Sequence, residues 1–289
     1  MKVLFVGVFD NSFLSTNTSQ LLCINELVDK VVGYNYRQKA VELGSHNRDK
    51  HLIQTITEGC FDLVLFSKCN QVNYSVFKAA TSLSTTCLWF MDPLTTYNEE
   101  MRVKTSLVDY LCCDKKDVLL AAERINKNSF YVCEGFDSRN DLPHNVPKEH
   151  EVTFLGNVYG NRANLFGKLN RVVNIRNNAY GKEHALEVSR SLINLNICTD
   201  NAASDRVYKT LAAKGFLISN DWHGREEIFE DEKDLVIFHD AQDLNKKIEF
   251  YLANQELAKI IAESGYNKVQ KYTRLSWAKE IIRLYEQIK

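Results

Sequence analysis

The sequence predicts two α/β domains, each built on a parallel sheet covered by helices. Short, nearly continuous apolar stretches alternate with helical stretches along the chain, which is typical of parallel strands buried on both faces. A polar, turn-rich stretch at residues 134–149 interrupts this alternation and contains two of the three prolines, Pro143 and Pro147. The 289 residues suffice for two domains of ordinary size. We expect one domain at residues 1–145 and another at residues 146–289.

Strand and helix alternate through the first half, beginning with an apolar strand at Val3–Val8. Further strands are expected at 31–34, 62–66, 86–90, 109–113 and 130–133, and helices at 18–29, 47–58, 74–81 and 115–125. This order predicts a Rossmann-like domain.

The second half repeats the plan. Strands are expected at 151–155, 171–175, 192–195, 216–218 and 234–238, with helices between them. Three amphipathic helices, at 244–252, 257–271 and 276–287, close the chain.

One stretch of the second half has the features of an anion site. The strand at 192–195 is followed by Ser204, a good N-cap for a helix that Gly215 is expected to end through a positive φ. The loop before this helix lies at the carboxyl edge of the sheet, beside free N–H groups and the positive end of a helix dipole. Arg206 and Lys209 share one face of the helix, where they either bind phosphate oxygens or are solvated surface charges.

Composition indicates a soluble globular protein, with 45% hydrophobic and 25% charged residues. Lys and Arg number 15 against 17 Asp and Glu up to Val146, and 21 against 20 beyond it, so neither half has the basic excess of a nucleic-acid-binding domain. The chain has no apolar run of membrane-spanning length and begins in a strand rather than a signal peptide, so a cytoplasmic location is expected.

The eight cysteines have no CxxC spacing, which favours reduced core thiols over disulfides or a zinc site. The histidines, among them His184, His223 and His239, are not spaced as metal ligands on one helix. No metal site is expected.

The first strand ends without GxGxxG or P-loop glycines, which argues against a common dinucleotide or NTPase site there. Asp10, Asn11 and Ser12 still follow it at the carboxyl edge, as ligand-binding residues or as plain turn residues. Asp92, fixed by Pro93, ends another strand at the same edge. It either orients a hydroxyl, acts as a base or caps the next turn.

Several segments resemble the CgeB-type family of glycosyltransferases, which has the GT-B fold of the group 1 transferases. The order and spacing of these segments carry the resemblance: Val152–Gly156 with Tyr159 and Arg162, Ser191–Asn196, Arg206–Tyr208, Leu211–Gly215, Glu226–Phe229, Leu235–Asp240, Asp243–Leu244 and Tyr251–Leu252. In the first half, Trp89–Pro93 and Gly135–Asp137 before Leu142–Pro143 add to it. About half of the chain matches closely.

The resemblance implies two Rossmann-like domains facing across a cleft. It implies transfer of a hexosyl or pentosyl group from a nucleoside diphosphate sugar to a hydroxyl, retaining if the protein follows its relatives, with no metal or other cofactor required. The absence of an Asp-x-Asp pair is consistent with this. The donor's base and sugar remain open, as does the acceptor, whether saccharide, protein, metabolite or modified DNA base.

The strand-edge positions described above and the resemblance together give the candidate site residues. The donor-binding candidates are Gly156, Asn157, Tyr159, Arg162, Asn196, Ser204, Arg206, Tyr208, Lys209, Trp222, His223, Glu226 and Glu227. The acceptor-side candidates are Asp10, Asn11, Ser12 and Asp92. Asp92 and Arg206 are the catalytic candidates, with Arg206 and backbone amides stabilising the charge that grows on the leaving diphosphate.

Two positions depart from the family pattern, because many relatives have Glu where this chain has Lys209 and an acid where it has Asn201. Lysine cannot accept hydrogen bonds from ribose hydroxyls. Either Glu226 or Glu227 holds the ribose, or Lys209 meets a phosphate, or activity is lost. Trp222 and His223 line the donor pocket or are structural. The alternatives to a transferase are therefore a catalytically silent nucleotide- or sugar-binding module and another two-domain α/β enzyme.

Overall fold

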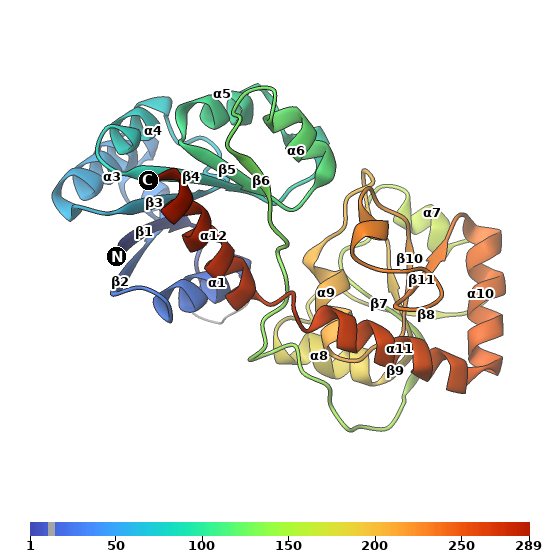
Figure 1. Ribbon diagram of the computed structural model, residues 1–289. Helices are drawn as coiled ribbons and strands as arrows, with labels where there is room; N and C mark the ends of the chain where they lie inside the picture. The colour runs from blue at the N-terminus through green and yellow to red at the C-terminus, as the bar shows by residue number, and fades with distance from the viewer. Residues whose placement is uncertain (11–14) are drawn as a thin grey trace. The chain divides into compact units, whose positions relative to one another are not determined.

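The computed structural model describes residues 1–10 and 15–289, which form two compact units. Unit 1 comprises Met1–Glu134 and Arg274–Lys289, and unit 2 comprises Gly135–Thr273. Each unit is a parallel sheet with helices on both faces, as Figure 1 shows. Among the described residues, no helix is long and apolar enough to cross a membrane.

The sheet of unit 1 has six parallel strands in the order β2-β1-β3-β4-β5-β6. Their bounds are β1 Lys2–Gly7, β2 Lys30–Asn35, β3 Leu63–Ser67, β4 Thr85–Phe90, β5 Tyr110–Cys113 and β6 Ser129–Tyr131. The central strands are almost wholly buried because helices cover both faces.

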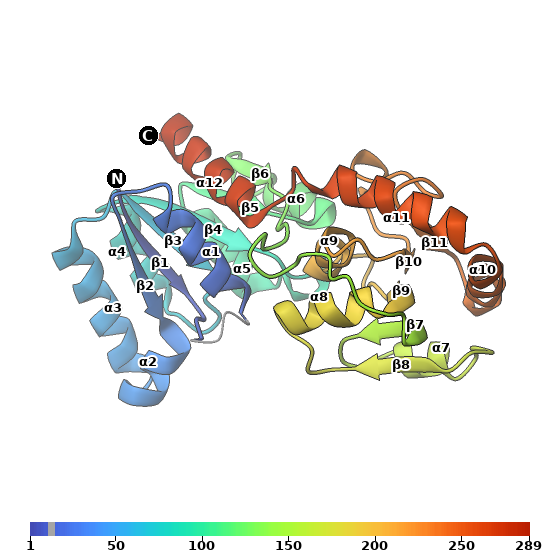
Figure 2. The same cartoon turned by 90° about the horizontal axis from the view of Figure 1, so that it is seen from below.

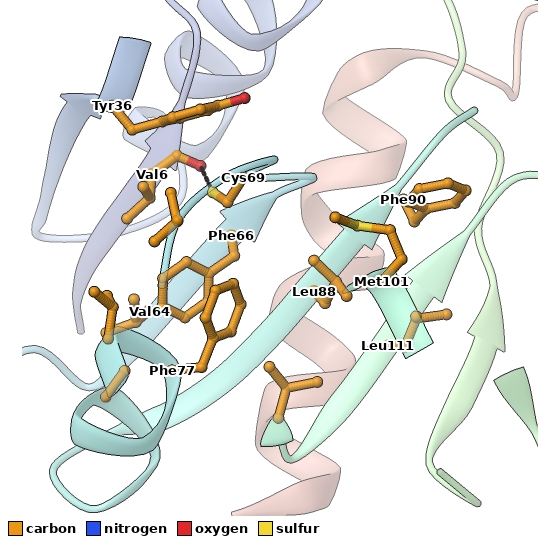
Figure 3. Close-up of a cluster of buried hydrophobic side chains, with 14 of the residues drawn as sticks. Val6, Tyr36, Val64, Phe66, Cys69, Phe77, Leu88, Phe90, Met101 and Leu111 are labelled. Atoms are coloured by element: carbon orange, nitrogen blue, oxygen red, sulfur yellow. Dashed lines mark hydrogen bonds between the residues drawn. The ribbon is translucent and has the colours of Figure 1, made fainter. Parts of the chain in front are cut away.

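The helices of unit 1 are α1 Thr16–Asn25, α2 Tyr36–Leu43, α3 Ser45–Gly59, α4 Tyr74–Thr81, η1 Leu94–Thr96, α5 Glu99–Leu107, α6 Lys116–Ala122 and α12 Arg274–Ile288. One core, which includes Phe66, Phe77 and Leu88, lies beneath α3, α4 and α5 (Figure 3). The core on the opposite face lies beneath α1 and α12, which run side by side in Figures 1 and 2.

The division into units differs from the predicted boundary near residue 145. The chain enters unit 2 at Gly135, and α12 belongs with unit 1 rather than with the second domain. Trp277 of α12 is 1% exposed and packs edge-on against Trp89 of β4, with ring centroids 5.5 Å apart. The polar linker marks a boundary in sequence, but it cannot show which sheet a distant amphipathic helix covers.

The helices α2 and α5 were not expected from the sequence. α5 carries a recognisable start signal, because the side chain of Asn98 accepts a hydrogen bond of 3.2 Å from the backbone N–H of Met101. Glu99 and Glu100 follow in the first turn, where acidic residues stabilise a helix.

Unit 2 has five parallel strands in the order β11-β10-β9-β7-β8. The strands are β7 His150–Leu155, β8 Val173–Arg176, β9 Ser191–Asn196, β10 Leu217–Asn220 and β11 Val236–Phe238. The helices are α7 Arg162–Phe166, α8 Lys182–Ser189, α9 Asp205–Ala212, η2 Arg225–Glu227, α10 Ala241–Ala253 and α11 Gln255–Val269. The chain runs from β7 to β8 on one side and then to β9 on the other. This reversal creates a crevice at the carboxyl ends of β7 and β9, where ligands of such sheets bind.

The end of α9 differs in detail from the prediction. Lys214, not Gly215, has the positive φ, at 58°. Gly215 is required for space instead, because a Cβ there would lie 2.4 Å from Cγ1 of Val188.

Candidate functional site

Two guanidinium groups meet at the reversal point of the unit 2 sheet. Arg206 projects from the first turn of α9, and Arg162 begins α7. Both lie over the ring of Phe154 in β7, with Cζ atoms 5.1 Å (Arg206) and 5.3 Å (Arg162) from its centroid. The fold thus brings together two cations separated by 44 positions in sequence.

Arg206 is held by the ends of β7 and β9. Its Nη1 donates a hydrogen bond of 3.1 Å to Oδ1 of the fully buried Asn196. Nδ2 of Asn196 in turn donates to Oγ of Ser219 at 2.9 Å. Gly156, directly after β7, leaves room for the guanidinium, because a Cβ there would lie 2.6 Å from Nη2 of Arg206.

Arg162 is fixed by backbone oxygens. Its Nη1 donates to the carbonyl of Asn157 at 2.8 Å and its Nη2 to the carbonyl of Ile197 at 2.6 Å. Its side chain is 4% exposed, and Tyr159 lies over its guanidinium with 4.3 Å between Cζ and the ring centroid. The group is therefore oriented before any ligand arrives.

No carboxylate of the described residues forms an ion pair with either guanidinium, although the charge of the nearby Asp205 acts to raise the pKa of Arg206. Within residues 1–10 and 15–289, neither Arg162 nor Arg206 forms an ion pair, and Asp205 pairs with Lys209 at 3.6 Å. Burial, reinforced by the neighbouring Arg162, lowers the pKa of Arg206 from its ordinary value. An anion placed between the two groups would gain charge-assisted hydrogen bonds and relieve their repulsion.

Two polar side chains near Arg206 are buried without hydrogen-bond partners. The hydroxyl of Ser204 occupies the predicted N-cap position of α9 but makes no capping bond, so it leaves the first amides of the helix unengaged by a side chain. Both ring nitrogens of His184 are unpartnered, and the side chain is 4% exposed. Burial, followed by the charges of Lys209 and Arg206, holds the pKa of His184 well below its ordinary value. The imidazole is therefore neutral at pH 7.

A cavity of about 680 Å³ opens at the carboxyl edge of the same sheet. This volume falls in the range of small-ligand sites. Tyr159 and Arg162, both predicted, line it together with residues at or just beyond the carboxyl ends of three other strands: Cys198, Asp200, Asn220 and His239. These four were not predicted as site residues. Each lies shortly after a predicted strand, at the edge of the sheet where the carboxyl ends of parallel strands come together.

Other predicted donor residues lie elsewhere in unit 2. Tyr208 and Trp222 are 4% and 7% exposed and pack against Phe229, with centroid distances of 5.9 and 6.5 Å. Tyr208 is a core residue because it lies, with Val207, on the buried side of α9. His223, Glu226 and Glu227 are exposed and do not line the cavity. The structure does not bring these five residues to the two guanidinium groups.

In unit 1, Asp92 lies just beyond β4, which ends at Phe90, and its Oδ1 lies 2.7 Å from Nζ of Lys68. Asp10 is exposed, and its backbone N–H bonds to Thr18 Oγ1 at 3.1 Å. Asn11 and Ser12 lie outside the described residues. In the part of the chain that the structure describes, no cluster of His, Cys, Asp and Glu could hold a metal ion.

Comparison with known proteins agrees with this architecture. The family described as glycosyl transferase-like matches residues 140–283, which contain the site. Anabaena HepE, solved with UDP-glucose, is similar in structure with a TM-score of 0.74, 10% identity and coverage of 99% of this chain and 100% of HepE. The sucrose-phosphate synthase of Thermosynechococcus elongatus matches with a TM-score of 0.70, 12% identity and coverage of 99% and 98%.

A putative UDP-N-acetylglucosamine 2-epimerase from Listeria monocytogenes also matches, with a TM-score of 0.61, 11% identity and coverage of 97% and 94%. No curated protein matches the sequence significantly. The structural matches confirm the predicted GT-B fold, and the family match supports a group 1 glycosyltransferase.

Proposed function

We propose that this chain, which has the GT-B fold and the sequence pattern of the group 1 glycosyltransferases, transfers a sugar from a nucleoside diphosphate sugar to a hydroxyl acceptor. The observation that carries the proposal is the pair Arg162 and Arg206, two oriented guanidinium groups without a carboxylate partner among the described residues. A diphosphate supplies the complementary charge, and the adjacent cavity has room for the rest of a nucleotide.

The two arginines would contribute most as the donor reacts. The bond between C1 of the sugar and the β-phosphate oxygen breaks while the acceptor oxygen bonds to C1. In the retaining course that we propose, the acceptor proton passes to the leaving diphosphate. Negative charge therefore grows on the phosphate beside Arg206 and Arg162, where fixed donors stabilise it. No metal is needed for this stabilisation.

Several finer assignments belong to the same proposal. UDP is the first nucleotide to try, because HepE was solved with UDP-glucose. Membership of the CgeB-type subfamily rests on the segments named above. The eight cysteines, for which the described structure shows no disulfide, are consistent with a cytoplasmic location. The sugar class, hexosyl or pentosyl, and the acceptor are left to experiment.

A catalytically silent nucleotide-binding protein is the second candidate. The observation in its favour is Lys209, whose ammonium group pairs with Asp205 and cannot accept bonds from ribose hydroxyls. Both candidates predict nucleotide binding, so only turnover separates them.

The test is a thermal-shift screen with UDP, GDP, ADP, CDP and dTDP, followed by assays of donor turnover. A nucleotide present at about 100 times its dissociation constant stabilises the folded state by roughly 2.7 kcal/mol. A shift with one nucleotide, and turnover of its sugars, is the expected result. Binding without turnover of any of its sugar nucleotides would favour the silent protein, and no shift with any nucleotide would refute both.

A further inference from the structure

A second feature lies in unit 1, in the turn Ser67–Gln71 that follows β3. In the unit 1 sheet β1 is flanked by β2 and β3, so the strand order reverses between β1 and β3. The turn therefore occupies the ligand-binding crevice position of its own sheet.

The backbone of this turn is strained. Lys68, Cys69 and Gln71 have φ angles of 56°, 58° and 62°, in the left-handed region that residues with a Cβ rarely adopt. This conformation is unfavourable for such residues and persists only where the surroundings enforce it.

Two buried cations enforce it. Nζ of Lys104, which is fully buried, donates to the carbonyl of Cys69 at 2.7 Å. Nη2 of Arg48, which is 2% exposed, donates to the carbonyl of Gln71 at 2.6 Å. From the side of β1, the carbonyl of Val6 accepts a bond of 3.5 Å from the thiol of Cys69, drawn as a dashed line in Figure 3. Burying a cation is costly unless it is hydrogen-bonded, so these contacts hold the turn firmly in one conformation.

The held turn presents one side chain to Asp92. Nζ of Lys68 lies 2.7 Å from Oδ1 of Asp92, and the two side chains are 28% and 34% exposed. Both can therefore reach solvent while remaining paired. The backbone N–H of Lys68 donates to the carbonyl of Trp89 at 3.0 Å, which ties the turn to β4, the strand that ends shortly before Asp92.

We propose that Lys68 is a positioning residue that orients the Asp92 carboxylate toward a neutral, polyhydroxylated acceptor. The inference deepens the proposed function and rests on it. Lys68 engages one carboxylate oxygen, so the other oxygen stays available to accept a hydrogen bond from an acceptor hydroxyl. The remaining ammonium N–H groups can donate to neighbouring hydroxyls.

The charges around the pair favour a neutral ligand. Nearby, at the end of β5, the buried Asp114 pairs with Lys115, and the field of Asp92 acts on both. Asp92 and Asp114 each have a lysine partner, and Glu134 adds a further negative field at Lys115, whereas the guanidinium groups of unit 2 have no carboxylate partner among the described residues. The cluster offers hydrogen bonds rather than net positive charge, which fits a saccharide better than a phosphorylated acceptor.

The experiment compares the wild-type full chain with Lys68→Met, Lys68→Arg and the control Lys39→Met, which breaks an ion pair of the same 2.7 Å length on α2. Methyl α-glucopyranoside and glucose 6-phosphate are titrated separately while the NMR shifts of the backbone amides of residues 67–71 are followed. UDP affinity and the unfolding midpoint are measured for each variant.

The neutral glucoside should shift these amides in the wild type, in Lys68→Arg and in the control. In Lys68→Met its dissociation constant should rise about tenfold or more, with UDP affinity unchanged. Recovery in Lys68→Arg excludes a merely structural role. No shift in the wild type, equal binding by Lys68→Met, or tighter binding of glucose 6-phosphate would overturn the inference.

The UDP measurement separates this inference from the proposed function. UDP binding without Lys68-dependent glucoside binding refutes the inference alone. Lys68-dependent glucoside binding without binding of any nucleotide refutes the proposed function and leaves a saccharide site in unit 1.

Discussion

Nη2 of Arg206 lies 2.6 Å from the point where a Cβ of residue 156 would be, so Gly156 and this guanidinium share one space at the end of β7. No Cβ tolerates so close a contact, and something must move if one is added. A substitution at Gly156 can therefore move the Arg206 guanidinium without changing the charge of the site.

Gly156→Ala should displace the guanidinium from its bond to Asn196 and weaken binding of the nucleoside diphosphate about tenfold, the scale of one charged hydrogen bond. Titration calorimetry with the nucleotide found in the thermal-shift screen measures this. Gly44→Ala is the matched control, because Gly44 also has a positive φ, 78°, but a Cβ there would meet nothing within 4 Å. Equal nucleotide affinities of the two variants would show that Gly156 does not position Arg206 for binding.

Arg206→Ala should weaken the same binding by roughly 1.5–3 kcal/mol. Its unfolding free energy should change little, because the substitution also relieves repulsion by Arg162. Arg283→Ala, which removes an exposed partner of Glu280, serves as control. Unchanged nucleotide affinity in Arg206→Ala would show that Arg206 does not bind the diphosphate.

Asp92→Asn should reduce sugar transfer while leaving donor binding nearly intact, because Asp92 belongs to unit 1 and the guanidinium pair to unit 2. Turnover and nucleotide affinity are measured on the same preparation. An equal loss of both would assign Asp92 to the donor side or to the fold.

His184→Gln should flatten the pH dependence of stability. The folded-state pKa of His184 lies well below the unfolded value near 6.5, so between these two values the unfolded state binds more protons. The free energy of unfolding of the wild type should therefore fall as pH decreases below about 6.5, by up to roughly 1.4 kcal/mol per pH unit from this group.

Denaturant unfolding at pH 7 and pH 5 measures that slope in both proteins. His46→Gln, at an exposed position on α3, is the control. A wild-type slope retained in His184→Gln would show that other groups cause it.

Trp277→Ala should destabilise unit 1 by about 3–5 kcal/mol, the usual cost of truncating a fully buried aromatic side chain. Unit 2 should keep its nucleotide affinity, because α12 contributes to the core of unit 1 only. Hydrogen exchange resolved by segment measures the two units separately. Phe250→Ala, at a side chain 50% exposed on α10, should change neither. If Trp277→Ala increased the exchange rate, relative to the wild type, more in unit 2 than in unit 1, this division of the chain would be wrong.

The amino-acid sequence alone predicts the two parallel α/β units and most of their strands. Runs such as Val3–Val6 are apolar on both faces, and only a sheet covered by helices on both sides buries such runs. It also predicts the helix start at Ser204 that carries Arg206, and a loop from Gly156 to Arg162, because helix starts and strand ends have local signals.

Tertiary structure alone decided which of these residues meet. Periodicity places Tyr208 on a helix but cannot show that Phe229 covers it, and an amphipathic pattern cannot tell that α12 covers the sheet of unit 1. The approach of Arg206 to Gly156, and of Lys68 to Asp92, depends on strand order and on a turn held by buried cations. Local sequence fixes backbone preferences over a few residues, whereas these contacts join segments that only the packing of the sheet brings together.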